Sequence, residues 1–427
     1  MSPRKLISLA AGALFFAGAA SAQTVAITNA KAWTGTAQGT VESATIIIVD
    51  GEIAEVRTGE AALPAEAEII DADGGWVTPG IISPFSRTGL VEVSAEDSTN
   101  DTRASGTDYS IALKAADGFN PMATTVPVTR LEGVTRIVVA PTSGGDMFAG
   151  RGFVADTSGS QDSIIDDDAF VFVRMGEGGA SNAGGSRPAA WARLRAALSD
   201  ARTFPARFLA HNEGDALTRV DAQAFGPAAR GQQLILVEAH RASDLKRIIE
   251  FARTAPELNI AIVGGDEAWM IAEDLAESRI PVIVDPFQNL PASFEQLGAT
   301  SENAQRLIEA GVITAFAHLG DDSHQARLVL QSAGNAVANG VDHDDAMAAI
   351  TVVPALIFGL DGVGTIEPGA TADVVVWDGD PLEVMTAPTH VFIAGEAQSM
   401  ESRQTRLRDR YLGLENGDVP FAFKRSE

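Results

Sequence analysis

Apolar and polar residues alternate in two blocks, one near each end of the chain. The first block, residues 23–80, contains the runs TVAITNAKAW and SATIIIVDGEIAEVR, the second turning back at Asp50-Gly51. Asp-Gly between apolar runs is a strong hairpin signal. The second strand-rich block covers residues 360–400. Neither block can bury a sheet face by itself, so we expect both chain ends to meet in one small β-sandwich.

Between these blocks, over residues 81–359, short apolar runs alternate with amphipathic helical patterns. This pattern indicates an α/β fold with a parallel sheet, and the number of repeats favours a closed (β/α)8 barrel of the TIM type. A doubly wound open sheet is the alternative, but no Gly-x-Gly-x-x-Gly turn opens a helix after a first strand. The expected strands cover residues 133–141, 169–175, 233–240, 259–265, 280–286 and 312–318.

Two acidic or glycine-rich stretches fall between these elements. PTSGGDMFAGRG at 141–152 is expected to be a loop, either flexible or presenting backbone amides to a ligand. Asp166 to Asp168 are expected to form a solvated turn. Residues 401–427 are expected to form a C-terminal tail with a short helix.

Polar side chains recur where the expected strands end. In a barrel these ends converge on one mouth, where active sites are found. Any one of these residues could simply end its strand, but their recurrence favours a site. They are Glu177, Glu238, His240, Asp266, Asp285, His318, Asp321 and Asp322.

The first 22 residues have the layout of a secretory signal peptide. Arg4 and Lys5 precede an apolar run, and Ala20-Ser21-Ala22 stands ahead of Gln23. The alternative, an uncleaved membrane anchor, is disfavoured because the apolar run from 6 to 20 is shorter than the roughly 20 residues that span a bilayer. We therefore expect a periplasmic or secreted protein with no membrane span after cleavage.

The amino-acid composition and net charge exclude some kinds of site and disfavour some binding partners. The chain has no cysteine, which excludes disulfides, thiolate ligands and a cysteine nucleophile. Its formal net charge of −26 disfavours nucleic acid and anionic lipid. We expect a small-molecule substrate or ligand, and the sequence leaves a homo-oligomer open.

Three segments carry a resemblance to a known family: VTPGII at 77–82, EAHRASDLKRIIEFA at 238–252, and LDGVGTIEPGATADVVVWDGDPLE at 360–383. With these, the chain resembles the metal-dependent amidohydrolase superfamily, specifically the imidazolonepropionase-like amidohydrolases, over nearly its whole mature length. The resemblance implies a barrel with a split sandwich and hydrolysis of carbon–nitrogen bonds. It also implies a divalent metal such as zinc, which lowers the pKa of bound water, and an aspartate that shuttles the proton.

The sequence departs from the family pattern at the metal ligands. The positions of the family's His-x-His fall on Phe85 and Arg87, and phenylalanine cannot ligate while a guanidinium is a fixed cation. Where the family commonly has Glu-His-Gly, this chain has Val-Gly-Gly with Gly264 at the histidine position. In the remaining pair, Glu238 replaces the first ligand and His240 is kept. The resemblance therefore implies a degenerate metal site.

A site with fewer metal ligands can still be assembled from the remaining candidate residues. His240 and Glu177 are the predicted metal ligands, Asp321 the predicted catalytic residue, and Arg87 with Glu238 the predicted substrate contacts. Each has a structural alternative: Glu177 in a surface loop, His240 orienting the next helix, and Asp321 capping a helix.

Two functions remain open from the sequence. The first is a hydrolase of a cyclic amide, amidine or peptide-like C–N bond. The second is a catalytically inactive relative, a pseudoenzyme that binds a ligand and in which Arg87 pairs with a carboxylate. A metal-free hydrolase using His240 lies between them, and no Gly-x-Ser-x-Gly elbow supports a serine nucleophile.

Overall fold

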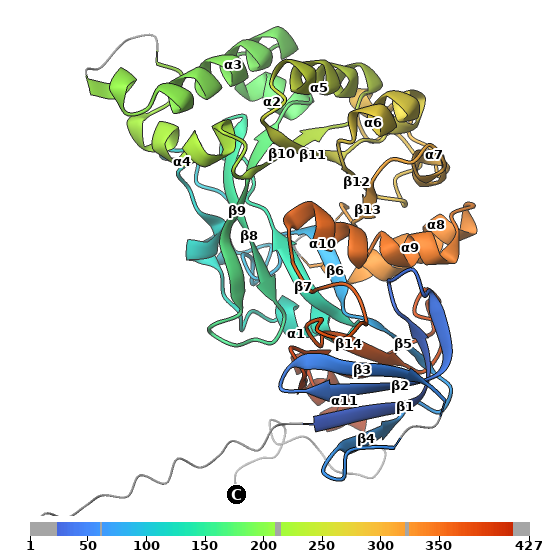
Figure 1. Ribbon diagram of the computed structural model, residues 1–427. Coiled ribbons are helices and arrows are strands. Elements are labelled where there is room, and N and C mark those ends of the chain that lie inside the picture. Colours follow the sequence, from blue (N-terminus) through green and yellow to red (C-terminus); the bar gives the residue numbers. More distant parts are fainter. Residues whose placement is uncertain (1–23, 60–61, 210–214, 321–323, 413–427) are drawn as a thin grey trace, which may run out of the picture.

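The computed structural model describes residues 24–59, 62–209, 215–320 and 324–412 (Figure 1). The expected signal peptide lies outside these ranges, as do Asp321 and Asp322. No helix within the described ranges combines the length and apolar character needed to cross a membrane.

Both ends of the chain build one sheet below the barrel, as expected (Figure 1). Its order is β16-β15-β14-β5-β1-β2-β3, and β4 pairs with β1. The early and late parts join where β5 pairs antiparallel with β14. The strands are β1 Thr24–Trp33, β2 Thr40–Val49, β3 Glu52–Thr58, β4 Glu68–Asp71, β5 Trp76–Pro79, β14 Val374–Trp377, β15 Pro388–Ile393 and β16 Glu396–Ala397.

The predicted hairpin at Asp50-Gly51 joins β2 to β3, and both residues have positive φ, 49° and 87°. A β-carbon at Gly51 would lie 2.8 Å from the Ala394 carbonyl oxygen, so the turn packs against the turn between β15 and β16. This contact requires glycine and holds the N-terminal and C-terminal parts of the sheet together.

The second sheet is a nearly closed eight-stranded barrel, which confirms the predicted fold class. Its order is β13-β12-β11-β10-β9-β8-β7-β6, and the outer strands β6 and β13 contact each other. The strands are β6 Ile81–Ser86, β7 Val134–Val139, β8 Phe148–Asp156, β9 Ile164–Arg174, β10 Leu234–Ala239, β11 Asn259–Gly264, β12 Val282–Val284 and β13 Thr314–Phe316.

One strand of the barrel was not predicted. Residues 148–152, expected in a loop, belong to β8, which runs antiparallel to both β7 and β9. Gly152 hid the strand in the sequence, and the reason is packing: a β-carbon there would lie 2.0 Å from the Phe170 ring on β9. The expected turn at Asp166 to Asp168 was also wrong, because these residues lie within the exposed part of β9.

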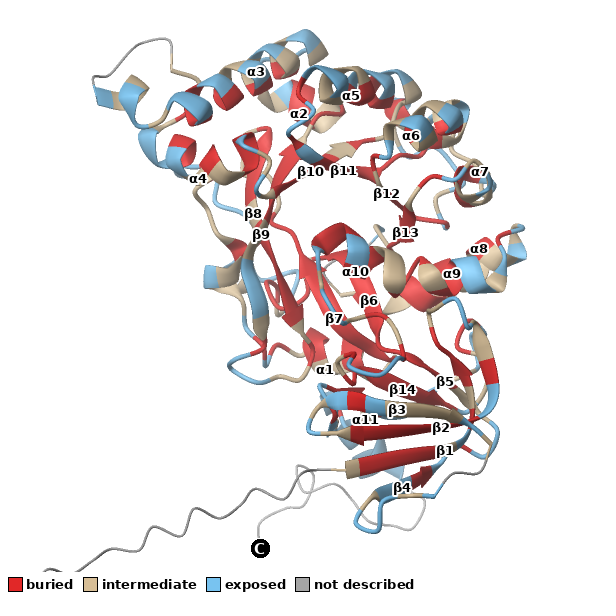
Figure 2. Cartoon of the chain, in the orientation of Figure 1, coloured by how far each residue is buried: buried red, intermediate tan, exposed pale blue. Residues whose placement is uncertain are grey.

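Helices cover the outer face of the barrel, and their buried faces follow the helical period (Figure 2). In α5, for example, Leu245, Ile248 and Ile249 point inward and are almost fully buried. The helices are α1 Thr125–Arg130, α2 Glu177–Asn182, α3 Arg187–Thr203, α4 Arg219–Ala229, α5 Ala242–Thr254, α6 Ala272–Ser278, α7 Asn303–Glu309, α8 Val329–Ala338, α9 His343–Ala348, α10 Val352–Phe358 and, in the tail, α11 Arg403–Leu412.

A buried ion pair joins the barrel to the sandwich. Arg136 of β7 donates from Nε and Nη2 to the two carboxylate oxygens of Asp373, which directly precedes β14. The side chains are 8% and 1% exposed. Asp373 also accepts a hydrogen bond from the Ala394 amide at 2.8 Å. One carboxylate therefore ties β7, the start of β14 and the β15–β16 turn together.

Replacing Asp373 by asparagine should destabilise the protein strongly, because the buried Arg136 guanidinium would lose the carboxylate that it is hydrogen-bonded to. We expect a loss of about 3–5 kcal/mol in the free energy of unfolding, measured by urea denaturation. Asp274→Asn is the matched control, because its partner Lys246 and Asp274 itself are 56% and 39% exposed. A loss for Asp373→Asn no larger than the control's would show that the pair does not hold the two sheets together.

Candidate functional site

A cavity of about 210 Å³ opens at the carboxyl ends of the barrel strands. Arg87 directly follows β6, Arg174 ends β9, and His240 directly follows β10. Because parallel strands direct their carboxyl ends to one mouth, residues far apart in sequence meet here. The cavity is lined by Phe85, Arg87, Thr142, Ser143, Phe172, Arg174, Glu238, His240, Val263, Gly264 and Leu319.

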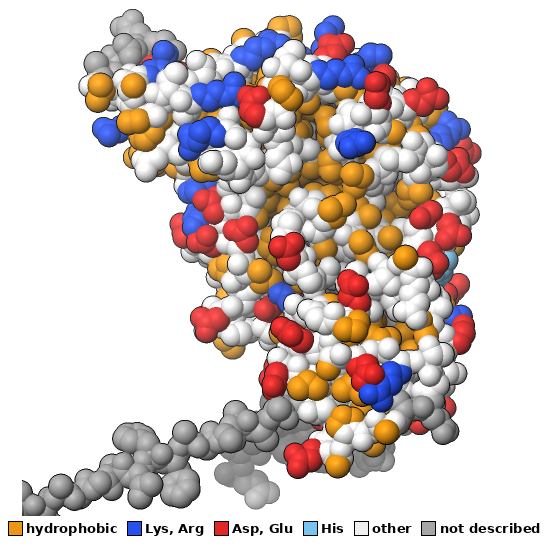
Figure 3. Space-filling view, viewed as in Figure 1, with side chains coloured by type: hydrophobic (Ala, Val, Ile, Leu, Met, Phe, Trp, Pro, Cys, Tyr) orange, Lys and Arg blue, Asp and Glu red, His pale blue; other side chains and the backbone are white. Residues whose placement is uncertain are grey.

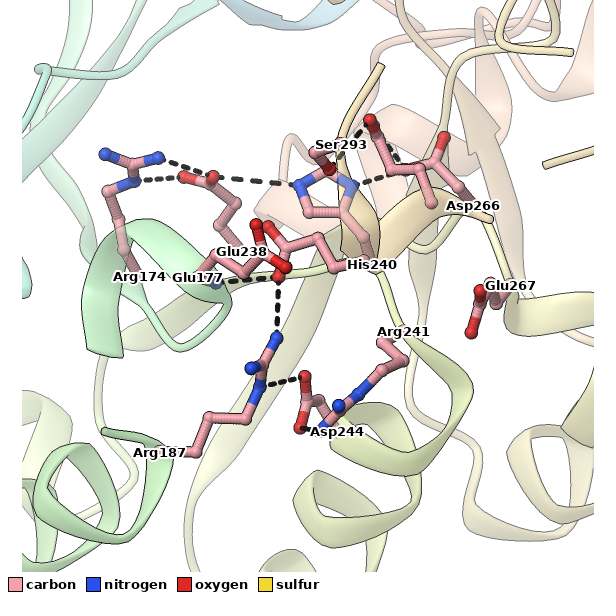
Figure 4. Close-up of polar contacts among 12 residues, drawn as sticks. Arg174, Glu177, Arg187, Glu238, His240, Arg241, Asp244, Asp266, Glu267 and Ser293 are labelled. Atoms are coloured by element: carbon pink, nitrogen blue, oxygen red, sulfur yellow. Dashed lines mark hydrogen bonds and ion pairs between the residues drawn. The ribbon is translucent and has the colours of Figure 1, made fainter. Parts of the chain in front are cut away.

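Four side chains of alternating charge form a continuous row at one side of the cavity (Figure 4). Arg174 holds both oxygens of Glu238, with Nε to Oε2 at 2.6 Å and Nη2 to Oε1 at 2.9 Å. The Nε2 atom of His240 lies 3.7 Å from Glu238 Oε1. The Nδ1 atom of His240 is hydrogen-bonded to Asp266 Oδ2. We call this row the charge chain.

The charge chain fixes the protonation of its members. Burial alone would raise the pKa of Glu238, but hydrogen bonds from His240 and Arg174 hold it at about 2. Burial alone would lower the pKa of His240, but Asp266 and Glu238 outweigh it and raise that pKa to about 10. At neutral pH, therefore, Glu238 is a carboxylate and His240 an imidazolium with both ring nitrogens protonated.

Gly264, at the end of β11, makes room for His240. A β-carbon at this position would lie 2.6 Å from Cε1 of the imidazole, and the residue has φ of +106°. No other residue type fits here without displacing the ring. At the position where the family resemblance implies a histidine, the absence of a side chain leaves room for the His240 ring.

The floor of the cavity is aromatic. Phe85 and Phe172 pack edge to face with ring centroids 5.4 Å apart. The Arg87 guanidinium carbon lies 5.3 Å from the centroid of the Phe85 ring, a cation–π distance. Burial lowers the pKa of Arg87 to about 10, with the Glu238 charge opposing and the Arg174 charge adding to this effect. Arg87 therefore remains a cation at neutral pH.

The loop between β12 and α7 supports the charge chain from outside. Gln296 donates to Asp266 Oδ2 at 2.9 Å. The neighbouring Glu295 accepts from the Glu177 amide at 2.7 Å and from Arg187 Nη2 at 3.2 Å. Burial raises the pKa of Glu295. This loop thus orients Asp266 and anchors the start of α2.

A second acid–histidine pair lies at the ends of the next two strands. Asp285 follows β12 and its Oδ2 is 3.9 Å from Nδ1 of His318, which follows β13. The Leu319 amide donates to Asp285 at 2.9 Å, and Phe287 packs edge-on to the His318 ring with centroids 5.8 Å apart. Burial raises the pKa of Asp285. Neither Asp285 nor His318 lines the cavity.

The structure brings three of the five predicted site residues together: Arg87, Glu238 and His240 line one cavity. Glu177 begins α2 and meets Glu295 through its backbone amide rather than lining the cavity. Asp321 lies outside the described residues, so its catalytic role stays a prediction.

Arg174 was not among the site residues predicted from the sequence. It stands directly behind the apolar run FVFV of a predicted strand, which is the same signal that selected Glu238. A positive charge at a strand end was therefore a signal that could have found it.

The carboxylate and the imidazole of the described lining already have partners within the protein. Glu238 is bound to Arg174, and His240 is an imidazolium, whereas a metal ligand needs a neutral imidazole or a carboxylate with an open lone pair. Within the described ranges, no group of three or more His, Asp or Glu side chains is arranged to hold a metal ion. The described lining carries three cations and one carboxylate, so it fits an anion better than the divalent metal that the resemblance implies.

Comparison with known proteins identifies the family. The model of the amidohydrolase family matches residues 115–399. The amidohydrolase TasK of Hapsidospora irregularis is 24% identical over 388 residues, which cover 83% of this chain and 39% of TasK, so the chain spans about two fifths of that relative. A dihydroorotase of Anaeromyxobacter dehalogenans is 26% identical over 376 residues, covering 78% of this chain and 84% of the dihydroorotase.

Among solved structures, the amidohydrolase of Thermotoga maritima MSB8 has a TM-score of 0.77 and is 26% identical, covering 87% of this chain and 99% of that chain. The match thus includes the barrel and the sandwich together. This chain belongs to the amidohydrolase family, whose members are hydrolases that act on amide and other carbon–nitrogen bonds.

Proposed function

We propose that the protein hydrolyses a C–N bond in a small molecule that carries a carboxylate, and that the mouth cavity is its active site. One observation supports this proposal: among the described residues, the lining combines the cations Arg87, Arg174 and His240 with one carboxylate, Glu238, over the aromatic floor. Such a lining favours an anionic group beside an apolar one. It stands out in a chain whose formal net charge is −26.

Arg87 is the proposed anchor for the substrate carboxylate. It faces the cavity from the end of β6 and lies over the Phe85 ring of the cavity floor. A guanidinium can hold a carboxylate through two parallel hydrogen bonds. Binding the carboxylate there would place the rest of the substrate along the Phe85 and Phe172 rings.

His240 is the proposed acid. Its Nε2–H is directed to the Glu238 side of the cavity, while Asp266 holds Nδ1. An imidazolium there can donate a hydrogen bond to the carbonyl oxygen when water attacks the carbon. It can then give its proton to the leaving nitrogen as the C–N bond breaks. Asp321 remains our candidate for the base that takes the proton from the attacking water.

Kinetics on a panel of dipeptides and cyclic amides, each with and without a free carboxylate, test these roles. His240→Gln should lower kcat by about 100-fold or more, because the amide keeps a hydrogen bond but cannot give a proton. Arg87→Met should raise KM for carboxylate-bearing substrates with a smaller effect on kcat. His390→Gln, an exposed histidine on β15, is the control. Equal activity of His240→Gln and the control would refute the assignment.

A second function, ligand binding without turnover, is favoured by one specific observation. Phe85 and Arg87 stand where the family resemblance implies His-x-His, and the remaining donors are engaged in the charge chain. This alternative predicts that carboxylates bind the cavity while no member of the panel is hydrolysed.

Elemental analysis of the purified protein tests the metal question directly. We expect well under one equivalent of zinc, because Arg87 and Arg174 raise the cost of placing a divalent cation between them. The double variant Phe85→His, Arg87→His should take up more zinc, because it removes one cation and adds two imidazoles. About one equivalent in the unmodified protein would instead mean that a metal site has been rebuilt from other ligands.

We also propose that the protein is exported to the periplasm or secreted, on the basis of its first 22 residues. Expressed in a bacterial host, the mature chain should begin at Gln23 by intact-mass measurement of the periplasmic fraction. Replacing Ala20 and Ala22 by bulky residues should block the cleavage. A full-length chain beginning at Met1 in the cytoplasm would contradict the proposal.

A further inference from the structure

Helices α3 and α5 form a basic face on an acidic protein. Together they carry seven Lys or Arg and only three Asp or Glu, whereas the whole chain has 31 basic and 57 acidic residues. Lys and Arg side chains gather over these helices at the top of the molecule in Figure 3. Six of these seven side chains form ion pairs with carboxylates of the described chain, so the charge that this face can offer an anionic partner depends on which of the pairs are weak.

A groove of about 550 Å³ runs between these two helices. Arg187, Trp191 and Arg195 contribute from α3, and four residues apart is the spacing that places side chains on one helix face. Arg247 and Phe251 repeat the same basic-then-aromatic order on α5. The groove has the volume of a small-molecule site.

The two ends of the groove differ in how strongly their arginines are paired with carboxylates of the protein. At the inner end, Asp244 is almost buried and accepts from Arg187 at 2.7 Å and from Arg241 at 2.8 Å. The charges at this end are balanced, because Arg187 also donates from Nη2 to Glu295 at 3.2 Å. The inner arginines therefore shape the groove.

At the outer end, the guanidinium groups of Arg195 and Arg247 are accessible to a ligand. Arg195 lies 5.5 Å from the Trp191 ring, and within the described part of the chain no carboxylate forms an ion pair with it. Arg247 is 67% exposed, and its ion-pair partner among the described residues is Glu250, which is 45% exposed. Exposed pairs of this kind are weak and exchange readily for a better anion. The Trp191 and Phe251 rings, 5.4 Å apart, form the apolar base between them.

We infer that the α3–α5 groove is a second binding site, separate from the mouth cavity, for a small polyanion with two or more phosphate or carboxylate groups. Arg195 on α3 and Arg247 on α5 place one accessible guanidinium group on each side of the groove. A ligand with a single anionic group would engage one of the two and leave the other unused. Phosphate and carboxylate share the chemistry that guanidinium groups recognise.

Calorimetric titration of the full-length mature protein with inorganic pyrophosphate and with citrate, at low ionic strength, tests the inference. We expect saturable binding of at least one of them, and the tighter of the two identifies the preferred anionic group. The double variant Arg195→Met, Arg247→Met should weaken this binding about tenfold or more, because methionine keeps the apolar stem and loses the charge.

Two control variants distinguish binding in the groove from binding in the mouth cavity and from a general effect of charge. Arg306→Met removes another arginine that lies over a tryptophan, 4.4 Å from the Trp269 ring, and should change the affinity less than about twofold. Arg87→Met alters the mouth cavity, which is proposed to bind a carboxylate, and should leave the affinity for pyrophosphate unchanged. Loss of pyrophosphate binding in Arg87→Met would place the anion in the mouth cavity, and an equal loss in Arg306→Met would show only a general effect of charge. Either result, or no saturable binding of either anion, would overturn the inference.

Discussion

Buried charges must be paired, and the pairing of Arg174, Glu238, His240 and Asp266 determines what the barrel mouth can do. Each member neutralises its neighbour, so the row persists in a site with little solvent. The same bonds set the charge states, which leave a carboxylate and an imidazolium facing the cavity. The chemistry available at the mouth therefore follows from the charge chain as a unit.

The neighbouring positions are consistent with this arrangement. Gly264 provides the space in which the His240 ring stands, and Phe85 gives an apolar floor over which Arg87 lies. In a relative with imidazoles at these positions, the same mouth would present lone pairs to a cation. Here it presents guanidinium groups, which is the physical basis for proposing an anionic substrate group.

The fold was largely predictable because it depends on periodicity. The apolar run LILVEA of β10 and the 3.6-residue period of apolar positions in α5 show from the sequence which residues are buried. The Asp50-Gly51 pair likewise predicts its hairpin from local sequence alone. β8 was missed because its glycines lower strand propensity. Gly152 is required because the Phe170 ring of the next strand occupies the space beside it, and this contact exists only after the strands pair.

For the site, too, some features were predictable from the sequence and others depended on the tertiary structure. The sequence by itself determined the family and the barrel with its split sandwich, since these depend on residue type and spacing. It also shows phenylalanine and arginine at positions 85 and 87, where the family resemblance implies histidines. Only the tertiary structure decided that Arg174 meets Glu238 across 64 residues and that Asp266 holds His240. A side chain's partner, and with it the pKa and the role, depends on which strand ends converge, and the linear order of residues does not contain that geometry.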